Sequence, residues 1–554
     1  MMAMWKEALQ DAQEIRCVEP AHRASDWEQM VQNLKKLFSD LSQQISRYQT
    51  ETLANRQREK EEVKELILTT RTALRYGLCC VSFQDEEARV DFQNHAVLNC
   101  DTHSALTRVL CMNKADSKCR LLSAQLMSNL VTCNEATAES LTSALSVAPP
   151  EDKMVARIFA SNFSGSDDKS NEESSSDTTV VVPPNWVDCF IFSIKSDNRG
   201  AAAAVTAALH NCVCALESKI DHRQSFIEDV ASDPILISSM LRNFIPAKRS
   251  IESEDYGEWD QATEWINLLL TKLIRLGMIG RMYIGISRCP LSDMKCVLPE
   301  QNVLLHCMVK QLEDERDVEE MLDQVGLESF EFLANLFCKL KNLSKTGSGG
   351  DEMLLLQSAV ISILEISSTF LAIDSVGCSK VRNHLGTTTE FLPQCATLLA
   401  NIVDVLAKRN EGVKAREMKM SPEEQDQITL LVRVVGNLCF RCKQNQDLMR
   451  SILLPMASTS HTGDEDTNNN NPEQRNALHV LLSCTTFATA CFTLREWSVI
   501  AIRNVLEDNP SNQEIVAQLD ANGPIQTAAL SEAGLKVQLD SKGKVSLSTL
   551  KEEN

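Results

Sequence analysis

Apolar residues recur at helical spacing through almost all of this 554-residue chain, and no other feature restricts its fold as strongly. Within 47–80, for example, Val63, Ile67 and Leu74 lie on one face of a helix. The same pattern predicts further helices over 118–132, 201–220, 259–279, 303–321, 329–343, 351–373, 391–408, 423–441, 447–453, 477–492 and 494–507. The sequence therefore predicts an all-α protein.

Composition supports this prediction and disfavours a β sandwich or barrel. Only 19 of the 554 residues are Gly and only 5% are aromatic, whereas folds of short strands need many Gly-rich turns. Hydrophobic residues make up 43% and charged residues 24%, which is typical of a globular protein with a sizeable core.

Four of the expected helices carry an asparagine inside an apolar run. They are Asn129, Asn335, Asn437 and Asn504, with Asn211 as a looser fifth case. After two of them a second asparagine follows eight residues later, at Asn445 and Asn512. Asparagine is mildly unfavourable inside a helix because its amide competes for backbone groups. The recurrence predicts that the amide connects one structural repeat to the loop of the next.

The asparagine spacing favours a helical-repeat fold. The first intervals fit two and three repeats of about 40 to 47 residues. We expect an armadillo/HEAT-like superhelical array interrupted by polar insertions, with an irregular multi-helix bundle as the alternative.

The last two asparagine motifs resemble a known family. Residues 494–504 (LREWSVIAIRN), followed by Asn512-Gln513-Glu514-Ile515, resemble the C-terminal domain of the ataxin-ten family. Residues 435–439 (VGNLC), with 445–447 (NQD), are similar to the upstream repeat of that domain. The resemblance extends from about residue 423 to the C-terminus.

The resemblance implies an armadillo-repeat protein without enzymatic activity. Members of the family are cytoplasmic, self-associate through the C-terminal domain and support cytokinesis, neuronal survival and neurite outgrowth through partner binding. The perinuclear region and the midbody are the sites at which such a protein would act. This chain departs from the family pattern in its acidic 161–185 insertion, its 458–476 insertion and its long middle region.

Polar segments divide the chain into domains. The sequence predicts N-terminal repeats over 1–160, a disordered acidic linker over 161–185, middle repeats over 186–344, a flexible loop over 345–351, C-terminal repeats over 352–525 and a tail over 526–554. The C-terminal repeats include the ataxin-like part, about 423–525, with its insertion at 458–476.

The charge balance favours proteins as partners. With 55 Lys and Arg against 76 Asp and Glu, the formal net charge is −21, which disfavours nucleic acid. The N-terminus has no apolar signal segment, so the 20 cysteines are expected to be reduced thiols in the cytosol or nucleus. The apolar stretches 353–373 and 476–494 contain polar residues and are interpreted as buried helices, without membrane insertion.

No motif predicts an enzyme, a cofactor or a small-molecule substrate. Nucleotide-binding, zinc-protease and hydrolase signatures are missing, and 347–350 (GSGG) lacks the Lys that would contact a phosphate. Cys439 and Cys442 have zinc-ligand spacing, but no second pair follows at finger spacing. They are interpreted as core residues.

Two sets of residues are candidates for protein binding. The first would mediate self-association, because the apolar arc of helix 494–507 is too wide for a helix covered on one side only; it could also be simply the innermost helix of its repeat. This set consists of Trp497, Val499, Ile502 and Leu506.

The second set would line a partner-binding groove. Its members follow i, i+4, i+8 spacing on two helices, as Glu331, Asn335 and Lys339 and as Arg433, Asn437 and Arg441, with Asn504 in addition. In one interpretation Arg433 and Arg441 bind an acidic segment of a partner. In the other, each stripe only bridges neighbouring repeats.

Two classes of function follow. The first is a non-catalytic scaffold that binds proteins, including a second copy of itself. The second is a transport or regulatory adaptor that binds an extended peptide, as nuclear import receptors do with a ladder of Trp and Asn. Only Trp497 lies near an asparagine motif here, so the scaffold is favoured.

Overall fold

The structure is a computed structural model. It describes residues 60–80, 86–99, 102–111, 116–144, 189–190, 198–217, 226–245, 260–288, 297–314, 318–343, 350–410, 417–455, 474–487, 491–518, 535–539 and 545–549, together with residues 6, 10, 193 and 413. The predicted linker 161–185 lies outside the described residues, as do most of the predicted loop 345–351 and of the insertion 458–476.

The described chain divides into two compact units. The first consists of residues 1–333 with 342–366, and the second of residues 334–341 with 367–554. Helices α17 and α18 each contribute to both units. In each unit successive helices pack on their neighbours along the chain, so the prediction of an all-α helical-repeat fold is confirmed.

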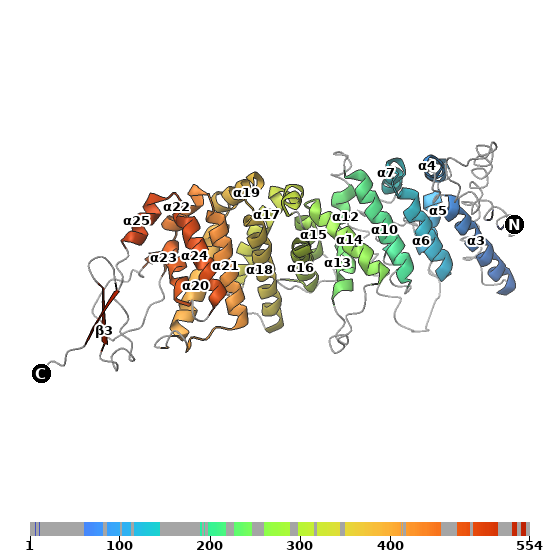
Figure 1. Ribbon diagram of the computed structural model, residues 1–554. Helices are drawn as coiled ribbons and strands as arrows, with labels where there is room; N and C mark the ends of the chain where they lie inside the picture. Colours follow the sequence, from blue (N-terminus) through green and yellow to red (C-terminus); the bar gives the residue numbers. More distant parts are fainter. Residues whose placement is uncertain are drawn as a thin grey trace. The chain divides into compact units, whose positions relative to one another are not determined.

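The first unit contains a row of long helices with shorter ones beside them. Helices α3, α6, α10 and α14 pack on one another in chain order and lie side by side in Figure 1. Its helices are α3 (Lys60–Cys80), α4 (Glu86–Asn94), α5 (Thr102–Cys111), α6 (Ser117–Val131), α7 (Glu135–Ala144), α10 (Arg199–Leu216), α12 (Glu228–Ser232), α13 (Pro234–Leu241), α14 (Gln261–Arg275), α15 (Ile279–Ser287), α16 (Pro299–Asp314) and parts of α17 (Val318–Leu343) and α18 (Gly350–Leu371).

Aspartate side chains cap two long helices of the first unit, α6 and α14. The Asp116 carboxylate accepts a hydrogen bond from the Cys119 backbone N–H at the start of α6, and Asp260 accepts one from Thr263 N–H at the start of α14. Both carboxylates also accept two hydrogen bonds from an arginine of an earlier helix, Arg71 for Asp116 and Arg199 for Asp260. The caps therefore also join neighbouring helices.

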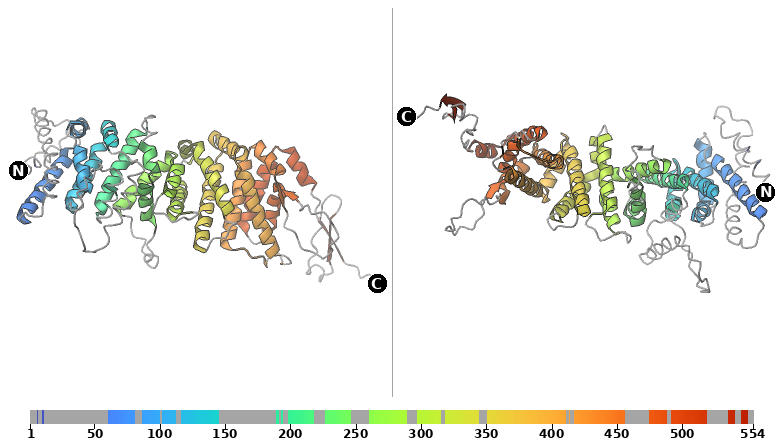
Figure 2. Two further views of the ribbon diagram at one scale, coloured as in Figure 1. Left: turned by 180° about the vertical axis from the view of Figure 1, so that it is seen from behind. Right: turned by 90° about the horizontal axis from the view of Figure 1, so that it is seen from below.

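The second unit contains the asparagine motifs of the C-terminal region. Helix α21 packs on both α20 and α24, and these helices lie together in both views of Figure 2. Its elements, besides parts of α17 and α18, are α19 (Val376–Thr387), α20 (Phe391–Arg409), α21 (Pro422–Cys439), α22 (Lys443–Ser451), α23 (Ala477–Ser483), the 3₁₀ helix η7 (Cys484–Phe487), α24 (Phe492–Leu506), α25 (Pro510–Ala517) and the strands β1 (Leu453–Pro455), β2 (Gln474–Asn476), β3 (Leu535–Leu539) and β4 (Val545–Thr549).

Helix α21 is the central helix of this unit. Ser421 and Glu424 form a reciprocal capping box at its start, and Pro422 occupies its first turn. Its next turns are buried on several sides, with Leu431, Val432, Val434 and Val435 each at 0% exposure. A helix buried on several faces is well suited to hold neighbours on both sides.

Two short antiparallel hairpins are the strand structure in the described residues. Strands β1 and β2 bring the ends of the 458–476 insertion together, with Leu453 opposite Asn476. Strands β3 and β4 lie within 526–554, which the sequence analysis treated only as a tail. The helix expected over 477–492 is also interrupted: it changes to a 3₁₀ turn at Cys484, and α24 begins at Phe492.

Two helices are long and apolar enough to cross a membrane by length and composition alone. They are α18, with 61% of its apolar window buried, and α20, with 44% buried. Helix α18 corresponds to the stretch 353–373 that was interpreted as a buried helix.

Candidate functional site

The second unit contains two copies of one turn, which we call the asparagine turn. Helix α21 ends at Cys439, Phe440 is extended, and Arg441 is left-handed with φ of 50° before α22 begins. Helix α24 ends at Leu506, Glu507 is extended, and Asp508 has φ of 52° before α25 begins. A backbone hydrogen bond closes each turn, from Cys442 N–H to Cys439 C=O and from Asn509 N–H to Leu506 C=O. These are type II turns with a non-glycine residue at the position that glycine prefers.

The asparagine before each turn joins two long helices. The side-chain amide of Asn437 donates a hydrogen bond of 3.0 Å to the backbone C=O of Ser368 in α18. The amide of Asn504 donates one of 3.0 Å to Gly436 C=O in α21. Both asparagines are 6% exposed. The amide thus connects a repeat to the preceding long helix, and not to the loop of the next repeat as the sequence analysis predicted.

The asparagine after each turn closes the preceding helix. The Asn445 amide donates to Leu438 C=O, and the Asn512 amide donates to Val505 C=O, in both cases to an acceptor seven residues earlier. Each of these amides also donates to a carbonyl of the preceding repeat, Arg382 for Asn445 and Gln446 for Asn512. Both side chains are fully buried. The constant eight-residue offset in the sequence is therefore explained by hydrogen bonds.

Close backbone packing accompanies these hydrogen bonds. A Cβ atom on Gly436 would lie 2.7 Å from Cβ of Ala501, so α21 and α24 approach each other through a position without a side chain. A Cβ atom on Gly386 would lie 1.7 Å from the side-chain oxygen of Asn445. These glycines leave room for the helix contact and for the amide.

A third asparagine turn lies in the first unit, after Asn129. Cys133 has φ of 54°, and the Thr137 hydroxyl donates a hydrogen bond to Leu130 C=O seven residues earlier. Thr137 thus occupies the position of Asn445 and Asn512. This copy has no asparagine eight residues after Asn129 and so lacks the sequence signal of the other two, but a threonine hydroxyl can donate the same hydrogen bond.

The fourth sequence match has a different structure. Asn335 is exposed on α17, and this helix continues past Lys339 to Leu343 instead of turning. Lys339 is also exposed, whereas Glu331 is half-buried. The looser match, Asn211, donates a hydrogen bond of 3.0 Å to the hydroxyl of Thr132.

The predicted groove residues of α21 have contacts within the fold. The Arg433 guanidinium lies 4.8 Å from the centre of the Trp497 ring, and Arg441 forms an ion pair of 2.6 Å with Asp374. With the Asn437 amide bonded to Ser368, this stripe fits the alternative in which it bridges neighbouring repeats. The groove itself stays a prediction, and Asn335, Lys339 and Arg441 are its exposed members.

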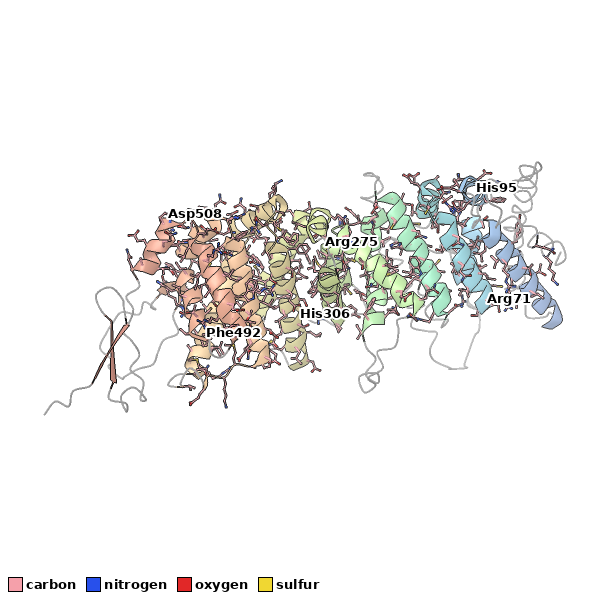
Figure 3. The ribbon with its side chains drawn as sticks, in the orientation of Figure 1. Arg71, His95, Arg275, His306, Phe492 and Asp508 are labelled. Atoms are coloured by element: carbon pink, nitrogen blue, oxygen red, sulfur yellow. The ribbon has the colours of Figure 1, made fainter. Side chains whose placement is uncertain are left out.

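The predicted self-association residues lie on α24 with unequal exposure. Val499 is 57% exposed, whereas Trp497, Ile502 and Leu506 are half-buried. Two residues that the sequence analysis left out are also exposed, Phe492 at 66% and Ile500 at 43%. Figure 3 marks Phe492 at one end of α24 and Asp508 beyond the other end. We call Phe492, Val499 and Ile500 the apolar face of α24, although Glu496 and Arg503 are also exposed on this side of the helix.

The cysteines of the zinc-like motif are part of the core. Cys439 is fully buried and burial raises the pKa of its thiol; Cys442 is 9% exposed and begins α22. Within the described residues, no three His, Cys, Asp or Glu side chains come together in a way that could hold a metal ion.

Comparison with known proteins finds a family match for the region that contains α24. A family model described as the Spinocerebellar ataxia type 10 protein domain matches residues 450–548, which include α24, α25 and the β3–β4 hairpin. The chain is 26% identical over 137 residues to the Ataxin-10 homolog of Dictyostelium discoideum, a match that covers 24% of this chain and 19% of that protein.

Two further relatives match over similar lengths. Ataxin-10 of Homo sapiens is 25% identical over 108 residues, or 20% of this chain and 18% of the relative. The Ataxin-10 homolog of Saccharomyces cerevisiae is 22% identical over 161 residues, or 28% of each chain. The chain thus covers only 18–28% of the length of these relatives. Among solved structures, the crystal structure of Uso1-2 aligns with 88% of this chain and 63% of its own, at 12% identity and a TM-score of 0.32.

Proposed function

Because this chain belongs to the ataxin-10 family through its C-terminal region, we propose that it is a non-catalytic scaffold that binds other proteins and self-associates through α24. One observation carries the proposal. Within the matched region, α24 presents an apolar face in which Phe492 and Val499 are more than half exposed. Large exposed apolar side chains are unfavourable in water, and several of them on one element typically mark an interaction site.

The position of this face in the fold supports the proposal. Phe492 and Val499 are seven residues apart and so lie on nearly the same side of the helix. The buried side of α24, with Leu494, Ala501 and Val505 at 0–1% exposure, packs on α21 and α23. In a helical-repeat protein the outer side of a long helix normally receives the next repeat. A second copy of the chain would cover it instead.

The test compares two valines of equal exposure. Val499→Glu places a carboxylate on the apolar face, whereas Val405→Glu places one on α20, where Val405 is 55% exposed. We expect Val499→Glu to raise the dissociation constant of self-association about tenfold or more, because an unpaired charge is costly to bury. Sedimentation equilibrium of the full chain measures this constant.

The outcome of Val405→Glu makes the test specific. This variant should associate like the original chain. Equal weakening by both substitutions would point to a general effect of charge, and no weakening by Val499→Glu would refute self-association through α24.

The import-receptor alternative receives less support from the structure. A peptide-binding ladder needs asparagine amides that are accessible to the peptide. The amides of Asn437 and Asn504 instead donate hydrogen bonds to Ser368 and Gly436 within the fold.

The cellular role that we propose follows the family. By that resemblance the chain acts in the cytoplasm, at the perinuclear region or the midbody, and supports cytokinesis, neuronal survival and neurite outgrowth. Its partners are other proteins and a second copy of itself, and nucleic acid, membranes and small-molecule substrates are outside the proposal.

A further inference from the structure

The chain contains a single serine or threonine that is followed directly by proline. It is Ser421, at the start of α21, and each of the other 14 of the 15 prolines follows a residue of another type. A Ser-Pro or Thr-Pro pair is the minimal recognition signal of proline-directed protein kinases. These enzymes transfer the γ-phosphoryl group of ATP to the serine or threonine hydroxyl. The sequence therefore offers this class of kinase one target.

The structure leaves this target accessible. Ser421 and Pro422 are exposed, and residues 418–420 before them have no regular secondary structure. Ser421 has an extended backbone, with φ of −70° and ψ of 158°, because a following proline disfavours the helical conformation. Kinases bind the residues around a target hydroxyl in an extended conformation. The Ser421 hydroxyl oxygen accepts one hydrogen bond, of 3.2 Å, from Glu424 N–H, and a hydroxyl oxygen has a second lone pair that can attack phosphorus.

A cation lies beside this hydroxyl. One carboxylate oxygen, Oε2 of Glu424, accepts a hydrogen bond of 2.9 Å from the Ser421 backbone N–H and one of 2.8 Å from the Arg409 guanidinium at the end of α20. The Arg409 side chain is 47% exposed, so it is free to turn toward a new partner. A phosphoserine carries about −1.5 to −2 charges at pH 7 and has three acceptor oxygens, so it attracts arginine more strongly than one carboxylate does.

We propose that Ser421 is a phosphorylation site for a proline-directed kinase and that its phosphate takes Arg409 from Glu424. In the reaction the Ser421 oxygen bonds to the γ-phosphorus of ATP, the hydroxyl proton passes to a base of the kinase, and ADP leaves. The phosphate then holds the end of α20 to the start of α21 through the guanidinium. The inference goes beyond the proposed function and does not depend on self-association, because it assigns a modification to the contact between two packed helices.

Treatment of the full chain with a purified cyclin-dependent kinase and ATP tests the site. We expect mass spectrometry of the peptides to find about tenfold or more phosphate on Ser421 than on Ser375, which also caps a helix, α19, but is followed by Val376. Pro422→Ala keeps the serine and its cap and should reduce phosphorylation of Ser421 about tenfold. An unmodified Ser421 in the original chain, or full phosphorylation in Pro422→Ala, would overturn the proposal.

The contact with Arg409 is tested by a 31P NMR titration of the phosphorylated full chain. An arginine beside a phosphate favours its doubly charged form, so the second pKa of the phosphate should be lower by about 0.5 in the original sequence than in Arg409→Gln. Lys408→Gln is the matched control, because it removes the same charge at the neighbouring exposed position, and it should leave this pKa within about 0.2 of the original. The same pKa in Arg409→Gln and in the original sequence would show that the phosphate does not take Arg409.

Discussion

Asn437 and Asn335 lie in similar apolar runs, but the regions around them have different structures. Asn437 is 6% exposed, its amide is bonded to Ser368, and α21 ends two residues later. Asn335 is exposed, and α17 continues for eight further residues. An asparagine in an apolar run is therefore not sufficient for the repeat contact. The contact also needs the following turn and a neighbouring helix close enough to offer a carbonyl.

The strongest way to break the Asn437 region is to add one methyl group beside it. In Gly436→Ala the new Cβ would lie 2.7 Å from Cβ and 2.8 Å from Cα of Ala501, so the backbones of α21 and α24 must separate. We expect a loss of about 2–3 kcal/mol in stability, measured by hydrogen exchange of the α21 amides. Gly350→Ala is the control, because no atom lies within 4 Å of its new Cβ. A tolerated Gly436→Ala would show that this approach is not required.

The amides themselves give the next largest contrast. Asn437→Ala removes a buried hydrogen bond and should cost about 1–2 kcal/mol. Asn335→Ala changes an exposed helix position and should stay within about 0.5 kcal/mol, in the stabilising direction because alanine favours helix. The same exchange measurement on α21 and α17 compares them. Equal costs at the two sites would contradict the distinction drawn here.

Glycine substitutions four residues after each asparagine, at Arg441 and Lys339, should change stability in opposite directions. Arg441→Gly relieves the left-handed conformation and should stabilise the turn by about 1 kcal/mol, since its exposed ion pair with Asp374 contributes little. Lys339→Gly places glycine inside a continuous helix and should destabilise it by about 1 kcal/mol. Urea titration followed by hydrogen exchange of the backbone amides measures both changes in stability. Two changes of the same sign would refute the turn assignment.

Acid should affect carboxylate contacts between helices but not amide contacts. The Arg199 guanidinium beside Asp260 holds the pKa of that carboxyl well below its usual value of about 3.9. Its contribution is therefore complete above about pH 4 and is lost as the pH falls further, through the lowered folded pKa. Because the side chain is 44% exposed, solvent screening limits this contribution to about 0.5 kcal/mol.

Asp260→Asn should remove this acid dependence while keeping the cap on α14. Thermal unfolding from pH 5 to pH 2 compares the variant with the original chain. An unchanged acid response in the variant would show that Asp260 is not its source.

Much of the helical architecture could be predicted from the sequence. Apolar spacing predicted α6, α10, α14, α20, α21 and α24 closely, because each buries a long, continuous face. The eight-residue offset between Asn437 and Asn445 corresponds to a repeated turn, but the contact predicted for the amide, with the loop of the next repeat, was wrong. Short helices such as α12, α13 and α15 were missed, because a helix of two turns has too few residues to establish a period.

The candidate site was less predictable, because its properties depend on neighbours. Asn335 and Asn437 look alike in sequence, and only the end of α21 and the position of Ser368 separate them. The left-handed Arg441 and Asp508 have none of the glycine signal that usually marks such a turn. Exposure of Phe492 and Ile500 depends on what packs beyond α24. Pairing of β3 with β4 depends on a register that an apparent tail does not reveal.

The most direct test of the central claim is hydroxyl-radical footprinting of the full chain over a range of protein concentrations. If the apolar face of α24 is the self-association surface, oxidation of Phe492 should fall several-fold as the chain associates, while oxidation of Val405, which is 55% exposed on α20, stays constant. If Phe492 keeps its full reactivity in an associated sample, or the chain remains a monomer throughout, self-association through α24 is wrong.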